Sequence, residues 1–238
     1  MYHKSSLLLI FCLLFLNFSN SQNSDQVFKI FDSIVGLENT ILYNGFEFQD
    51  SEVTINEKNK FLFPESDYQI GSVRYSNQYF PEVPLKFNVV DDRLFVKITY
   101  GNTSAFFQLI SEKVEEFSIQ DKNFKRLDFP EEVNGFYQEL FTSQDYSLYK
   151  KYRKTAKEKF DRNFLYYEFN FSEPSYLIVH NNRAFRADSK NDLTDIFPDR
   201  KKEIKSFYKD QKSLSQRNMD AFMQNLVKEM TNQKTMNP

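Results

Sequence analysis

Hydrophobic and polar positions alternate along most of the chain between residues 41 and 180. Side chains of a β-strand point in turn to its two faces, so a period of two predicts strands. The alternating stretches are 41–48, 68–75, 80–90, 93–100, 105–110, 114–120, 124–129, 135–141, 146–152, 163–171 and 175–180. Short connections rich in Asn, Asp and Gly separate them, which favours an antiparallel meander. Pro81 and Pro84 indicate that their strand lies at an edge of the sheet or contains a bulge.

Helical spacing appears towards both ends of the chain. Apolar residues recur every three or four positions in 25–36, which predicts a short N-terminal helix. Beyond residue 188, Asn191 can cap one helix, Pro198 can start a second, and Asn218 can cap a third. The third has an apolar stripe that we expect to pack on the sheet or a neighbouring helix, with docking to a partner protein as the alternative: Met219, Phe222, Met223, Leu226, Val227 and Met230. We therefore expect an α+β protein: an antiparallel β-meander, forming a curved sheet or partial barrel, with a short N-terminal helix and two or three C-terminal helices.

The first residues have the layout of a secretory signal peptide. Lys4 precedes an apolar run from Leu7 to Phe18, and small polar residues follow, with a cleavage position after Ser21. The run is shorter than the roughly 20 residues of a membrane-spanning helix, and no later stretch reaches that length. We expect residues 1–21 to be a signal peptide, 22–188 to form the mainly antiparallel β region with its N-terminal helix, and 189–238 to form a helical part packed on the same unit. The expected location is the periplasm, the outer membrane or the extracellular space.

Composition excludes several kinds of catalytic site. Cys12 is the only cysteine and lies within the expected signal peptide, so the mature chain would have no disulfide and no thiolate. His180 would be its only histidine, which excludes the usual zinc sites. No glycine-rich nucleotide-binding motif occurs, and no nucleophile motif accompanies His180. We expect no cofactor, no metal and no catalytic residue, and we interpret His180 as a residue at the end of a strand.

Adjacent acidic residues are the remaining candidates for hydrolysis, which needs two convergent carboxylates. One pair falls in an expected hairpin turn, one points to opposite faces of a strand, and one follows a proline in a connection: Asp91-Asp92, Glu115-Glu116 and Glu131-Glu132. None has the arrangement of a catalytic pair.

Basic residues gather in the second part of the chain. Residues 22–144 have 11 Lys and Arg against 20 Asp and Glu, whereas residues 145–238 have 19 against 13. This asymmetry indicates either two regions that attract each other or a basic part that faces an anionic partner.

The densest basic cluster is YSLYKKYRKTAKEKF, residues 146–160. Strand alternation mixes tyrosines and cations on both faces, so neither face is expected to be buried, and residues 155–160 are expected to form a loop or a short helical turn. Our first interpretation is a solvated ribbon whose lysines protect a strand edge. The alternative is a site for an anionic surface, formed by Lys150, Lys151, Arg153, Lys154 and Lys157. Lipid headgroups or acidic glycans fit an exported protein, whereas nucleic acid does not.

Several motifs together resemble a known family. They are NGFEF (44–48), GSVRY (71–75), QYF (78–80), VPLKFNVVDDRLFVK (83–97), LYKKYRK (148–154) and SKNDLTDIFPDRKKEIKSFYK (189–209). The set is similar to a family of uncharacterised exported proteins of Bacteroidota, flavobacteria especially, over nearly the whole mature chain. The resemblance implies an envelope location and one β-rich unit with a helical C-terminal part. It assigns no catalytic residue.

These observations favour a non-catalytic exported envelope protein that binds a partner protein or another envelope component. The alternative is a carrier of a lipid or other apolar ligand in an aromatic-lined cavity. An acid-residue hydrolase ranks third. The first two differ in whether aromatic side chains fill the interior or line a void, namely Phe106, Tyr137, Phe164, Tyr166 and their neighbours.

Overall fold

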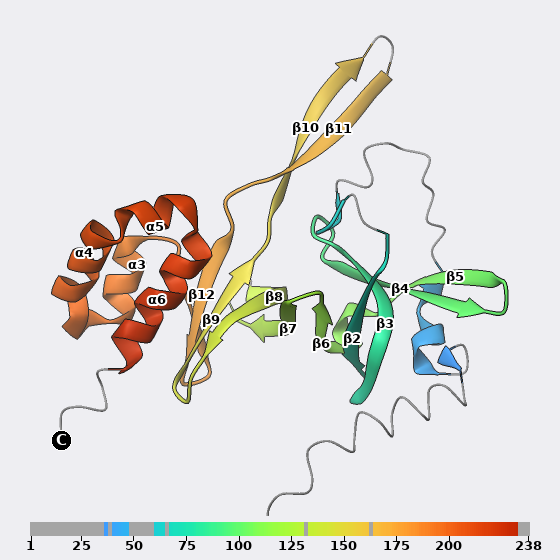
Figure 1. The fold of residues 1–238 in the computed structure, drawn as a ribbon, viewed down its shortest axis with the longest axis horizontal. Coiled ribbons are helices and arrows are strands. Elements are labelled where there is room, and N and C mark those ends of the chain that lie inside the picture. The colour runs from blue at the N-terminus through green and yellow to red at the C-terminus, as the bar shows by residue number, and fades with distance from the viewer. Residues whose placement is uncertain are drawn as a thin grey trace, which may run out of the picture.

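The computed structural model describes residues 36–37, 40–47, 60–64, 67–130, 133–161 and 164–232, and Figure 1 shows the arrangement of its elements. The strands are β1 (Phe46–Glu47), β2 (Gln69–Tyr75), β3 (Gln78–Asn88), β4 (Arg93–Tyr100), β5 (Thr103–Gln108), β6 (Val114–Ile119), β7 (Lys122–Phe129), β8 (Val133–Thr142), β9 (Tyr146–Lys151), β10 (Lys154–Asp161), β11 (Phe164–Phe171), β12 (Ser175–His180) and β13 (Arg183–Arg186). The α-helices are α3 (Lys190–Ile196), α4 (Lys201–Asp210), α5 (Lys212–Arg217) and α6 (Met219–Asn232). Short 3-10 helices are η2 (Ile41–Asn44), η4 (Ser111–Lys113) and η5 (Pro198–Arg200).

Eleven strands form one open antiparallel sheet in the order β1-β5-β4-β3-β2-β6-β7-β8-β9-β12-β13. Two hairpin-connected runs, β2 to β5 and β6 to β9, meet where β6 pairs with β2. Only residues 109–113 connect β5 to β6, although three strands separate these two in the sheet. The sheet must therefore curl strongly at this point. The expected α+β class, with its antiparallel meander and C-terminal helices, is confirmed.

Aromatic rings fill the concave side of the curl. The ring of Phe87 in β3 lies 5.2 Å from Phe117 in β6, 5.3 Å from Phe124 in β7 and 5.9 Å from Phe136 in β8. Phe117 and Phe124 stack at 4.7 Å. All four rings are almost fully buried, and burying one such side chain contributes roughly 1.5–3 kcal/mol. Packing within this cluster sets the distance between β3 and the strands β6, β7 and β8.

The helices cover the sheet at β9 and β12, as Figure 1 shows. The apolar stripe of α6 packs against inward-facing residues of these strands, including Leu148 and Ile178, so the alternative of partner docking is wrong for this stripe. Asn218 caps α6, because its Oδ1 accepts the Ala221 N–H at 3.0 Å. Helix α3 is capped by Ser189 instead of Asn191, through a reciprocal capping box with Asp192. Helix α5 is a short addition to the three expected helices.

The two prolines of β3 lie at or next to a bulge, since Pro81 falls within it and Pro84 pairs with Ile70 just beyond it. Gly71 pairs with Val83 and Val73 pairs with Phe80, so β3 contains one residue more than β2 between these pairs. Glu82 accordingly has φ of 56°. β3 lies between β2 and β4. The ladder with β4 covers only residues 85–88, however, so the part of β3 that contains both prolines pairs with β2 alone among the described strands. The bulge is therefore confirmed, and the prolines lie on a part of β3 that is an edge on its β4 side.

Residues 155–160 form a strand, so the expected loop or helical turn is wrong. They belong to β10, which pairs with β11 in a separate two-stranded sheet that projects from the body (Figure 1). We call this pair of strands, residues 154–161 and 164–171, the arm. Its residues 155–160 are mostly polar, and the apolar side chains that pair with them come from β11.

Two further expectations concern the N-terminal part. Of the strand expected at 41–48, residues 41–47 form η2 followed by β1, and not one long strand, because Thr40 Oγ1 caps the turn by accepting the Leu42 N–H at 3.4 Å. The expected signal peptide, and the expected helix at 25–36 except for Gly36, lie outside the described residues.

Candidate functional site

An open cleft of about 640 Å³ lies where the arm leaves the sheet. It is bounded by the turn after β3, by β8 and β9, and by both strands of the arm at its base. The lining residues are Val89, Val90, Asp92, Asn134, Tyr137, Lys151, Tyr152, Arg153, Lys154, Thr155, Ser172 and Glu173.

A change of register sets the base of the arm. Lys151 pairs with Ser175 in the β9–β12 ladder, and Lys154 pairs with Phe171 in the arm. Between these two pairs, residues 152–153 on one strand therefore lie opposite residues 172–174 on the other strand. The Ser172 N–H still donates to the Arg153 carbonyl oxygen at 3.1 Å. The arm consequently continues the pair of strands β9 and β12 but turns away from the sheet.

Lys151 is held against the back of the cleft. Its Nζ lies 2.7 Å from Asp92 Oδ2 and 4.7 Å from the centre of the Tyr137 ring. Asp92 also accepts the Phe136 N–H at 3.1 Å. Gly135 makes this contact sterically feasible, since a Cβ there would lie 1.8 Å from Asp92 Oδ2. The ion pair joins the β3–β4 turn to β8 and β9.

Lys154 lies on the arm side of the cleft. Its Nζ donates to the Phe61 carbonyl oxygen at 2.6 Å and lies 4.2 Å from the centre of the Phe171 ring. Burial lowers the pKa of Lys154 to about 8, because the ammonium group has lost part of its hydration. The lysine is therefore still mostly protonated at neutral pH.

Arg153 is the most exposed cation of the cleft. Burial lowers the pKa of Lys151 and the neighbouring Arg153 charge adds to that effect, whereas Asp92 opposes it. The guanidinium is thus close enough to Lys151 to act on it electrostatically. Among the ion pairs of the described residues, none involves Arg153.

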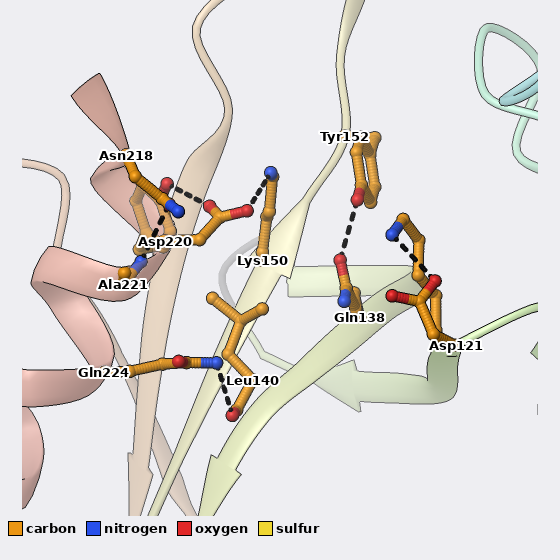
Figure 2. A network of polar contacts seen from close by, with 11 residues as sticks. Asp121, Gln138, Leu140, Lys150, Tyr152, Asn218, Asp220, Ala221 and Gln224 are labelled. Atoms are coloured by element: carbon orange, nitrogen blue, oxygen red, sulfur yellow. Dashed lines mark hydrogen bonds and ion pairs between the residues drawn. The ribbon is translucent and has the colours of Figure 1, made fainter. Parts of the chain in front are cut away.

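The two other predicted residues lie elsewhere. Lys150 points from the opposite face of β9 to Asp220 of α6, at 2.6 Å between Nζ and Oδ2 (Figure 2). Tyr176 donates its hydroxyl to the other oxygen of Asp220 at 2.6 Å, so this network ties α6 to the sheet. Lys157 is exposed along the arm. The structure therefore brings together Lys151, Arg153 and Lys154, while Lys150 and Lys157 lie outside the cleft.

The solvated-ribbon interpretation is wrong at two positions. The Lys150 side chain is only 12% exposed and the Lys151 side chain only 18% exposed. Asp92, Asn134, Tyr137, Ser172 and Glu173 were not recognised as site residues from the sequence. The local sequence signal was Gly135, since a glycine can mark a position with positive φ, here 95°, or a close approach of other atoms, here of Asp92 Oδ2.

The other candidate chemistries find no support in the described residues. His180 ends β12, where its Nδ1 lies 2.8 Å from the Asp145 carbonyl oxygen and its ring stacks on Tyr146. Glu116 pairs with Arg74 at 3.0 Å, and Glu115 accepts the Asn77 N–H at 2.7 Å. In the ranges that the structure describes, no group of three or more His, Cys, Asp or Glu could hold a metal ion. Within the same ranges, no helix is both long enough and apolar enough to cross a bilayer.

No protein-family model matches the chain, and neither a curated protein nor a solved structure matches it. The resemblance to exported Bacteroidota proteins stays a prediction from the sequence motifs.

Proposed function

We propose that the protein is a non-catalytic exported protein of a bacterial envelope, and that its cleft binds a carboxylate or phosphate group of another envelope component. The observation that carries the proposal is the convergence of Lys151, Arg153 and Lys154 in one cleft, with Asp92 already paired to Lys151.

The cations have distinct roles in this proposal. The planar guanidinium of Arg153 can bind both oxygens of a carboxylate or phosphate. Lys154 adds a point charge from a half-buried position, where electrostatic attraction is stronger than in bulk water. Lys151 is neutralised by Asp92 and is expected to shape the site and contribute less charge. The hydroxyl groups of Thr155 and Ser172 can donate further hydrogen bonds.

Binding of an anionic group is better supported than carriage of an apolar ligand. The rings of Phe87, Phe117, Phe124 and Phe136 occupy the concave side of the sheet. Of the aromatic residues expected to distinguish the two functions, Tyr137 is buried and Phe106 packs on Tyr68, with 5.4 Å between ring centres. Tyr166 lies on the arm, and the side chain of Phe164 lies outside the description.

Titration calorimetry tests the proposal with two chemically different anions, an acidic oligosaccharide and inorganic phosphate. Losing one charge-assisted contact should cost about 1.5–3 kcal/mol, so Arg153→Gln should weaken binding roughly tenfold or more. Lys157→Gln is the matched control, because it removes the same charge from the arm outside the cleft and should leave affinity unchanged. Sedimentation with vesicles that contain anionic phospholipid distinguishes a lipid headgroup from a soluble anion.

Equal weakening by the two substitutions would show that binding follows overall charge and not the cleft. The absence of binding to any of the three anions would refute the proposed function. The proposed export is tested separately by N-terminal sequencing of the protein from its own host, where Gln22 is expected as the first residue.

A further inference from the structure

A second cleft, of about 420 Å³, lies between η2 and the β4–β5 hairpin. Figure 1 shows η2 (blue) next to this hairpin (green), on the side of the body away from the α-helices. The lining residues are Tyr43, Ile98, Tyr100, Thr103 and Ala105. The volume lies within the roughly 300–1,000 Å³ that is usual for ligand-binding sites.

Strand alternation produces the floor and one wall of this cleft. Ile98 pairs with Ala105 and Tyr100 pairs with Thr103, so these four residues lie on the same face of the hairpin. Ile98 belongs to the core and is only 2% exposed, whereas Tyr100 is 71% exposed. The face of β4 that packs in the core therefore continues beyond the core at Tyr100, where the aromatic ring can contact a ligand.

The other wall comes from η2. Leu42 is fully buried and anchors this turn, and the ring of Tyr43 packs on Phe107 of β5 with 4.5 Å between ring centres. Gly45 permits the close approach of this segment to β5, since a Cβ there would lie 2.6 Å from the Gln108 carbonyl oxygen. Tyr43 is thus held in place and still remains 47% exposed. A ring that is fixed before binding loses little conformational freedom when it contacts a ligand.

The chemistry of this cleft fits a neutral ligand that has both apolar and hydroxyl groups. Among the described residues that line it, none is charged. Within the described part of the chain, the hydroxyl groups of Tyr43, Tyr100 and Thr103 have no hydrogen-bond partner, so all three can donate to a ligand or accept from it. A purely apolar ligand would displace water from these hydroxyl groups and offer no partner in return.

We propose that this cleft binds a neutral carbohydrate, with the rings of Tyr43 and Tyr100 packed against sugar rings. One face of a sugar ring consists mainly of C–H bonds and can pack on the negative face of an aromatic ring, while the hydroxyl groups at its edge form hydrogen bonds. The two exposed rings and three hydroxyl groups of the cleft match these two kinds of contact. The proposal is independent of the anion site, because none of these lining residues lines the cleft at the base of the arm.

Titration calorimetry at millimolar concentrations tests the proposal with three neutral probes: a β-linked glucose tetramer, an α-linked glucose tetramer and an N-acetylglucosamine tetramer. We expect at least one of them to bind. Tyr100→Ala should weaken that binding about tenfold or more, since an aromatic ring supplies a large contact area, and Tyr100→Phe, which retains the ring, should weaken it less. Tyr167→Ala is the matched control, because it removes an exposed tyrosine ring from the arm, outside this cleft.

Saturation-transfer NMR identifies the contact, because the C–H protons on one face of the bound sugar should receive magnetisation from aromatic ring protons. Far-UV circular dichroism of each variant establishes that the body is folded. Arg153→Gln, which addresses the anion site, should leave sugar binding intact, so failure of one site is distinguishable from failure of the other. The absence of binding to all three probes would overturn the proposal, as would equal weakening by Tyr100→Ala and Tyr167→Ala.

Discussion

Replacing Gly135 by alanine tests the contact behind the cleft. At its φ of 95°, an added Cβ would lie 1.8 Å from Asp92 Oδ2 and 2.6 Å from Lys151 Nζ, so the ion pair must move. A non-glycine residue at positive φ costs about 1–2 kcal/mol. Displacing half-buried, charge-assisted hydrogen bonds, including that from the Phe136 N–H, costs about 1.5–3 kcal/mol. We expect Gly135→Ala to lower the free energy of unfolding by about 2.5–5 kcal/mol.

Gly101→Ala is the matched control for the backbone part of this cost. Gly101 also has positive φ, at 57°, but no atom lies within 4 Å of an added Cβ. The expected loss is about 1–2 kcal/mol. Urea unfolding followed by far-UV circular dichroism measures both values. Their difference of about 2 kcal/mol combines the cost of displacing the ion pair with the greater backbone strain at φ of 95° than at 57°.

A double-mutant cycle identifies the atoms responsible. The Asp92→Ala substitution removes the carboxylate that an added Cβ at position 135 would meet. In that background, the free energy of unfolding lost through Gly135→Ala should fall towards the loss caused by Gly101→Ala. Equal losses for the two glycines in the wild-type background would contradict the described position of Asp92. An unchanged cost of Gly135→Ala without the carboxylate would contradict it as well.

Four further predictions concern the cleft and the helices. Burial lowers the pKa of Lys154 to about 8, so the affinity for an oligocarboxylate should fall as pH rises through 8, and Lys154→Met should remove this step in calorimetry. In the unfolded chain the pKa is about 10.4, so unfolding takes up a proton between these values and Lys154 should make the fold more stable as pH rises from 8 to 10. Asp220→Asn should lower the free energy of unfolding by about 2 kcal/mol, because Lys150 loses its charged partner, whereas Glu229→Gln on the exposed side of α6 should change it little. Ser189→Ala should cost about 1 kcal/mol in urea unfolding, through loss of the α3 cap.

Turns and strands were predictable because their signals are local. Asn181 and Asn182 both have positive φ, as does Asn77, and asparagine tolerates that conformation in tight hairpins. The pairing of β6 with β2 was not predictable, because the order of strands depends on which apolar faces come together. Phe87, for example, meets rings from three strands that follow it by 30 to 49 residues in the chain.

The arm was only half predictable, for a related reason. Residues 164–171 are rich in aromatic side chains, which alternate with polar ones from Tyr167 onward, and were expected to form a strand. Residues 154–161 contain few apolar side chains, so periodicity gave no signal, and their strand conformation depends on pairing with β11. A polar strand next to an aromatic one is the pattern of a ribbon that stands away from the core. That pattern can be recognised only when both strands are considered as a pair.

The basic cluster shows why charge density along a sequence does not locate a binding site. Lys150 and Lys151 are neighbours, yet strand alternation sends their side chains to opposite faces, where they meet Asp220 and Asp92. Each carboxylate is distant in sequence and neutralises one of the two lysines. Beyond them the ladder changes register, and Arg153 and Lys154 enter an open cleft instead of a packed face. The capacity to bind an anion therefore depends on which cations the fold directs into the cleft, and only the arrangement of the strands decides that.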